Sequence, residues 1–182
     1  MKEKTMSSGM WLLPISNKIF FTFFLSIITI AIGLGFLNYY ERTGFSQQKT
    51  SRYYCGDEEE DLDKPLSAEE NRARMEEGLA FPKSYRELLE VTHAHIFSLP
   101  IVVFILSRIL AMTHTREGLK ITIYGVSFMG IILNLAAPWL IRYVCHHFVI
   151  VFTISSIFLV LSFGAYIFIP LYEMWFRKDH AV

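Results

Sequence analysis

Four long apolar stretches determine what this chain can fold into. They cover residues 19–37, about 91–112, 121–141 and 148–172. A helix needs about 20 apolar residues to cross the ~30 Å hydrocarbon core of a bilayer, and each stretch is about that long. A soluble domain of similar size would show short amphipathic periods instead. The sequence therefore predicts an all-α fold, a four-helix transmembrane bundle with the lipid bilayer as its first partner.

The segments between these stretches complete the expected organisation. Residues 1–18 and 173–182 are polar tails, and residues 38–84 form an acidic, partly helical loop. Ser67 and Glu70 fit a capping box, which predicts a short helix at about 68–78. A second capping box at Ser84 and Glu87, with no breaker after it, predicts one helix over 85–112 that begins outside the bilayer and contains the second span. The first apolar stretch is too long for a signal peptide and is expected to be an uncleaved anchor.

Basic residues near the ends of the spans predict the orientation, because cytoplasmic loops carry an excess of Lys and Arg. The loop 38–84 is expected to be extracytoplasmic, and both tails cytoplasmic, in a multi-pass protein of the bacterial inner (cytoplasmic) membrane. The basic residues on the expected cytoplasmic side are Lys2, Lys4, Lys18, Arg116, Lys120, Arg177 and Lys178.

Four histidines are expected to gather at the extracytoplasmic ends of the spans. His93 and His95 lie where a polar helix start runs into the second span, and His146 and His147 lie at the start of the fourth. Polar side chains at the edge of a membrane bundle are costly and often functional, and imidazole binds haem iron, copper and zinc. These four histidines are therefore candidate metal ligands.

Helix geometry limits which of these four histidines can bind the same metal ion. His93 and His95 differ by about 200° around a helix, so both cannot reach one metal. His95 shares a face with Leu88 and Thr92 and is expected to point inward, whereas His93 is expected to point toward Glu90 or the loop. A haem b or a transition metal would then bind most simply between His95 and His147 on facing helices. The alternative is that all four are interfacial structural residues.

The two cysteines, Cys55 in the large loop and Cys145 between the third and fourth spans, would both face an oxidising compartment. There they could form a disulfide if their Cα atoms come within about 7 Å. The alternative is that they are unrelated residues.

Several function classes are disfavoured. The net charge is zero and there is no basic stripe, which argues against nucleic-acid binding. There is no phosphate-binding loop, and no third ligand with a suitable spacing completes a catalytic zinc site with His95 and His147. The sequence thus favours a non-enzymatic accessory or structural subunit of a larger membrane complex, with a haem- or metal-binding redox protein as the alternative.

Two segments also carry a resemblance. The run from Ser84 to His95 (SYRELLEVTHAH) and the run from Ala137 to Arg142 (APWLIR) resemble those of a group of uncharacterised small four-pass bacterial inner-membrane proteins. The resemblance covers roughly residues 55–176 and implies the four-pass architecture. The His-x-His pattern of His93 and His95 is also similar to short motifs of membrane haem and copper proteins, a likeness of three residues.

Overall fold

A computed structural model describes residues 9–57, 78 and 80–177, so the short helix expected at about 68–78 falls almost wholly outside the described residues. The described chain forms a four-helix transmembrane bundle. Its elements are η1 (Met10–Leu12), α1 (Ile15–Thr43), α2 (Gln47–Cys55), α5 (Tyr85–Ala111), α6 (Glu117–Tyr143), η2 (His146–Phe148) and α7 (Val149–Trp175).

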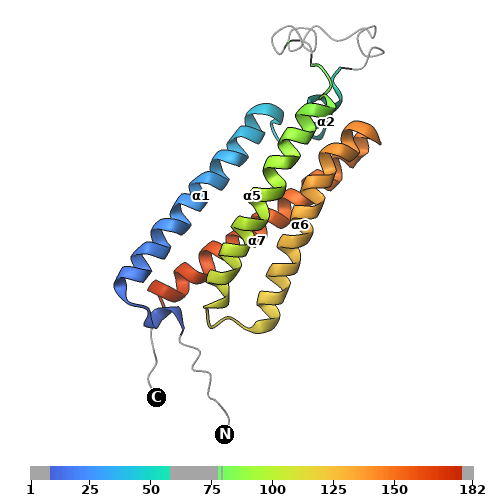
Figure 1. The fold of residues 1–182 in the computed structure, drawn as a ribbon. Coiled ribbons are helices and arrows are strands. Elements are labelled where there is room, and N and C mark those ends of the chain that lie inside the picture. The colour runs from blue at the N-terminus through green and yellow to red at the C-terminus, as the bar shows by residue number, and fades with distance from the viewer. Residues whose placement is uncertain (1–8, 58–77, 79, 178–182) are drawn as a thin grey trace.

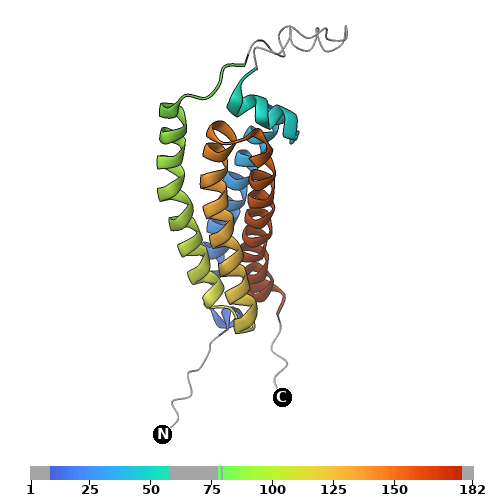
Figure 2. The same cartoon turned by 90° about the vertical axis from the view of Figure 1, so that its right-hand side faces the viewer.

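Successive spanning helices run in opposite directions, as Figure 1 shows. The start of α1, the α5–α6 turn and the end of α7 lie together at one end of the bundle, here called the η1 end. The start of α5, the α6–α7 turn and the short helix α2 lie at the opposite end, here called the α2 end. Figure 2 shows α2 lying across the α2 end.

Local signals explain where the helices start and stop. The capping box expected at the start of α5 is present, because Ser84 Oγ accepts from Glu87 N–H and the Glu87 carboxylate accepts from Ser84 N–H. Helix α1 continues beyond the apolar run 19–37 and ends where Gly44 adopts the left-handed conformation (φ 54°), which suits glycine. At the η1 end, Lys120 Nζ donates to the carbonyl of Ala111, a cation placed at the negative end of α5.

Helices α6 and α7 share the most extensive contact in the bundle. Gly130 allows their close approach, since a Cβ atom at this position would lie 3.1 Å from Leu159 Cδ2 of α7. Two polar contacts cross the same seam: Ser127 Oγ lies 3.0 Å from the Tyr166 hydroxyl, and Asn134 Nδ2 donates to Ser155 Oγ at 3.3 Å. Small residues and satisfied polar pairs are the usual means of joining helices in lipid, so this pair is the centre of the bundle.

Helix α5 packs against that pair along only part of its length. Leu106, Ile109 and Leu110, near the η1 end, are buried, whereas Leu88 is the one buried residue in the half of α5 nearer the α2 end. Figure 2 shows α5 separating from α6 toward the α2 end. There it is held by Trp139 of α6, whose Nε1 donates to Thr92 Oγ1 at 2.8 Å.

Helix α1 is peripheral. Only 6% of its most apolar stretch is buried, against 28% for α6 and for α7, and its contacts are with α2 and α7. One narrow stripe, which includes Phe21, Leu25, Ile28 and Ile32, packs against the core. The rest of the α1 surface is apolar and exposed, as expected of a helix that faces lipid.

The η1 end is fastened by a buried carboxylate. Glu173, in the last turn of α7, is 4% exposed and accepts from Met10 N–H at 3.0 Å and from His114 N–H at 2.7 Å. Arg177 lies 3.8 Å from the same carboxylate and above the Trp11 ring. Glu173 therefore ties η1 and the α5–α6 turn to α7.

Candidate metal centre

The turn between α6 and α7 brings three metal-binding side chains together at the α2 end. Helix α6 ends at Tyr143, and the backbone N–H of Cys145 donates to the Leu140 carbonyl at 3.0 Å. Cys145 then adopts an extended backbone (φ −164°, ψ 138°) before the single turn of η2. Because the chain changes from extended to helical at this point, the side chains of Cys145, His146 and His147 point into the same region.

The distances within this group suit a metal ion. Cys145 Sγ lies 3.1 Å from His147 Nδ1, and the ring centroids of His146 and His147 are 4.1 Å apart. Among the described residues, this is the group of three or more candidate ligands whose donor atoms all lie within 4.8 Å of one another. Both imidazoles are exposed, and Cys145 is half-buried.

The role of His95 as an inward-facing cofactor ligand stays a prediction. The His95 ring is exposed, and Nδ1 lies 2.8 Å from the carbonyl of Val91 in the same helix. Thr92, on the same side of α5, contacts Trp139 of α6, whereas the His95 side chain is exposed. The structure groups His147 with Cys145 and His146.

His93 differs from expectation. Its ring packs edge-on against Phe97, with centroids 5.1 Å apart, and the side chain is exposed. Glu90, its expected partner, instead binds Arg86 Nε at 3.0 Å. An arginine one turn earlier on an exposed helix face is a well-matched partner for a carboxylate.

Both cysteines contact the last turn of α6. Cys55 Sγ, at the end of α2, lies 3.3 Å from the Ile141 carbonyl, and Cys145 contacts His147 as described. The two sulfur atoms are not joined in the structure, and the Cys55–Cys145 disulfide stays a prediction. The consecutive Cys-His-His sequence at positions 145–147 is the sequence signal for the grouping of Cys145 with the two histidines.

A polar cavity of about 250 Å³ lies beside this region, between α2 and the first turns of α5. Its charged lining residues are Arg42, Lys83, Glu87 and Glu90. The Tyr53 ring is covered by both cations, with Lys83 Nζ 4.9 Å and Arg42 Cζ 5.5 Å from its centroid. Burial raises the pKa of the neighbouring Tyr54 phenol above its usual value, which keeps that hydroxyl neutral.

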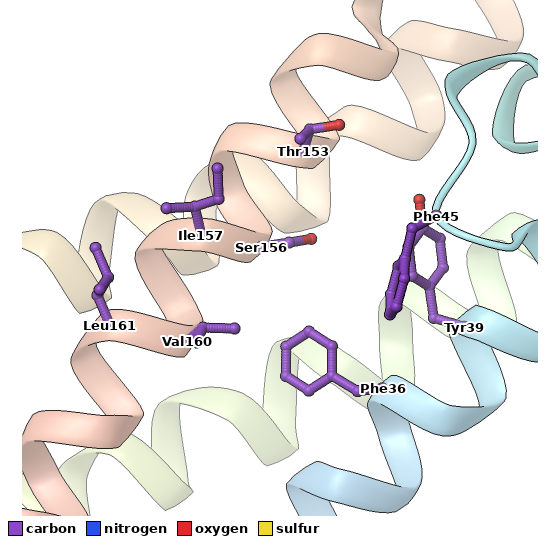
Figure 3. Close-up of a pocket in the computed structure, with 8 residues that line it drawn as sticks. All are labelled: Phe36, Tyr39, Phe45, Thr153, Ser156, Ile157, Val160 and Leu161. Atoms are coloured by element: carbon purple, nitrogen blue, oxygen red, sulfur yellow. The ribbon is translucent and has the colours of Figure 1, made fainter.

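A second, apolar groove of about 290 Å³ lies between α1 and α7. In Figure 3, Phe36 and Tyr39 of α1 lie across the groove from Val160 and Ser156 of α7. The Ser156 hydroxyl donates to the Phe152 carbonyl of its own helix and so does not require a polar ligand. The groove offers hydrocarbon surface to the membrane.

Four apolar spanning helices in one bundle define a multi-pass α-helical membrane protein. The sequence model of a family described as a transmembrane helical domain matches residues 44–181. The chain belongs to this family. The matched region contains α2, α5, α6 and α7 and leaves out α1. No curated protein and no solved structure matches the chain.

Proposed function

We propose that the protein is a non-enzymatic accessory subunit of a membrane complex and that α1 is the helix through which it joins a larger partner. The observation that carries this proposal is the position of α1. It crosses the membrane with 6% of its most apolar stretch buried, and it lies outside the region that defines the family. A spanning helix outside the family region, with most of its surface open, is suited to packing against a helix of another protein.

Small residues on the open sides of α1 support this role. Thr29 with Gly33, and Ala31 with Gly35, are small-residue pairs four positions apart, and such pairs let two helices approach closely in lipid. All four are exposed. A side chain added at Gly33 or Gly35 would meet nothing within 4 Å in this chain, so these positions are free to receive a partner helix.

We expect Gly33→Leu to release the protein from its complex without unfolding it. The added side chain fills open space in the monomer but blocks close helix approach. Native gel electrophoresis of digitonin extracts should show the unsubstituted protein in an assembly larger than the monomer and the variant at the monomer mass. Ile30→Leu, also exposed on α1, is the control and should leave the assembly intact. A monomeric unsubstituted protein would contradict the proposal.

We also propose that the η1 end faces the cytoplasm of a bacterial cell. Lys18, Arg116, Lys120 and Arg177 all lie at that end, in a short tail or turn next to a span, where basic residues favour cytoplasmic placement; the seven basic residues of the loop 38–84 are accompanied by eleven acids. Alkaline phosphatase fused after Val182 should be inactive, and green fluorescent protein fused there should fluoresce. Fusions between Ser46 and Gln47 should give the opposite pair of results. Active phosphatase at Val182 would reverse the orientation.

Metal binding at the α2 end is the second candidate function. The grouping of Cys145, His146 and His147 favours it, and a thiol beside two imidazoles is a ligand set for zinc or copper rather than for haem. In the proposed orientation this site is extracytoplasmic. Elemental analysis of protein purified without a polyhistidine tag should find about one bound transition-metal ion per chain. Metal-free protein that takes up none on addition of zinc or copper would eliminate this candidate.

A further inference from the structure

We propose that Cys145, His146 and His147 hold one thiophilic d¹⁰ metal ion, Zn²⁺ or Cu⁺, through one sulfur and two imidazole nitrogens, at the turn between α6 and α7. This inference rests on the second function proposed above, metal binding at the α2 end. It assigns each ligand and the chemical class of the ion, and it replaces His95 by Cys145 in the ligand set.

The donor distances are those of a site that closes by side-chain rotation alone. Zinc binds sulfur at about 2.3 Å and imidazole nitrogen at about 2.0–2.1 Å, so donor atoms around one tetrahedral ion lie about 3.3–3.7 Å apart. Cys145 Sγ and His147 Nδ1 are already 3.1 Å apart, and the full set falls within 4.8 Å. Because both imidazoles are exposed, small rotations of their rings meet little steric resistance.

Hydrogen bonds hold the backbone of the turn that carries the three proposed ligands. A metal site needs such a support, because ligands on a flexible segment would not stay close together. Cys145 N–H is bonded to the Leu140 carbonyl, and Phe148 N–H is bonded to the Cys145 carbonyl at 3.1 Å. Val149, the first residue of α7, is buried. The turn is therefore anchored on both sides by helices of the central α6–α7 pair, so the ligands sit on a rigid support.

The ligand types select the ion. A thiolate with two imidazoles suits Zn²⁺ and copper, whereas Ca²⁺ and Mg²⁺ require oxygen ligands. Three protein ligands leave one position of a tetrahedral ion open, as in catalytic and transfer sites rather than closed structural ones. Cys145 cannot serve this ion and the predicted disulfide with Cys55 at the same time. Metal binding therefore requires the reduced state of that pair.

Cobalt(II) substitution tests the ligand set directly. Metal-free protein, kept in a phosphine reductant that prevents the Cys55–Cys145 disulfide, is titrated with Co²⁺ and the spectrum is recorded. We expect one equivalent to give tetrahedral ligand-field bands and a sulfur-to-cobalt charge-transfer band. Zn²⁺ should displace the cobalt stoichiometrically. Binding without the charge-transfer band would exclude Cys145 as a ligand and overturn the inference.

Three single substitutions distinguish this ligand set from the site between His95 and His147 that the sequence predicts. Cys145→Ser should abolish the charge-transfer band, and His147→Ala should weaken Co²⁺ and Zn²⁺ binding by more than about 100-fold, since even outer-shell changes weaken metal binding by 10–100-fold. His95→Ala, an exposed histidine outside the group, is the matched control and should bind as tightly as the unsubstituted protein. Loss of binding in His95→Ala alone would move the site away from the α6–α7 turn.

The same experiments test the assigned ligand set separately from metal binding at the α2 end. If the unsubstituted protein binds no metal, both fail. If it binds one ion and Cys145→Ser binds equally well, metal binding stands and the assigned ligand set is wrong. Far-UV circular dichroism of each variant verifies folding; because the three residues lie at a surface turn and contribute no buried apolar side chain, the helical signal should be unchanged.

Discussion

Replacing Glu173 with alanine should lower the free energy of unfolding by about 3 kcal/mol. The carboxylate accepts hydrogen bonds from the backbone N–H groups of Met10 and His114, and a buried donor left without an acceptor costs about 1–3 kcal/mol. Arg177 contributes less, because its side chain is 42% exposed and 3.8 Å away. The measurement is a denaturation titration with sodium dodecyl sulfate in mixed micelles, followed by circular dichroism.

Two further variants test the reason given for this effect. Glu173→Gln retains one carbonyl acceptor and should lose roughly half as much stability. Trp11→Phe keeps an aromatic ring beside His114 and removes an indole N–H that, in the part of the chain that the structure describes, is buried without a hydrogen-bond partner. It should change the free energy of unfolding by less than about 1 kcal/mol. Equal unfolding midpoints for Glu173→Ala and the unsubstituted protein would show that the η1 end is not fastened through this carboxylate.

The architecture could be predicted from the sequence because lipid imposes one strong constraint. A backbone in hydrocarbon must satisfy its own hydrogen bonds, so long apolar runs become helices almost regardless of their neighbours. The start of α5 could be predicted for a different reason. The capping box of Ser84 and Glu87 depends only on residues three positions apart. These features are set within one turn of helix or one span, and the sequence contains them directly.

The exposure of the His95 side chain could not be predicted in this way, because it depends on contacts between helices. Its helical register matches that of Leu88 and Thr92, which do face the bundle, yet the ring is exposed. Periodicity identifies the side of a helix that faces its neighbours. It does not state whether a neighbour is close enough to cover that side.

The roles of Glu173 and Cys145 depend on contacts between distant parts of the chain or on turn geometry. Glu173 stands at the expected boundary between the fourth span and a polar tail, and its burial results from contacts with Met10 and His114, which are distant in the sequence. The sequence indicates Cys145 as a possible disulfide partner of Cys55. The extended backbone that turns its sulfur toward His147 is a property of the α6–α7 turn, which the sequence alone does not specify.

Enlarging Gly130 should separate the central pair of helices. A Cβ atom at this position would lie 3.1 Å from Leu159 Cδ2 and 3.2 Å from Phe158 Cβ, which is too close for an unshifted contact. Helix α7 would have to move away, and the Ser127–Tyr166 and Asn134–Ser155 contacts, within about one helical turn on either side of Gly130, would lengthen. Overpacking of this kind costs about 1–3 kcal/mol.

We therefore expect Gly130→Leu to lower the free energy of unfolding by about 2 kcal/mol, measured by the same detergent titration. Gly125→Leu is the matched control, because Gly125 is exposed on the same helix and a Cβ there meets nothing within 4 Å. It should leave stability unchanged or raise it slightly, since leucine favours helix more than glycine does. If both glycine positions tolerate leucine equally, α6 and α7 are not packed as closely as the structure shows. The bundle would then be held mainly by its ends, where Glu173 and the α6–α7 turn lie.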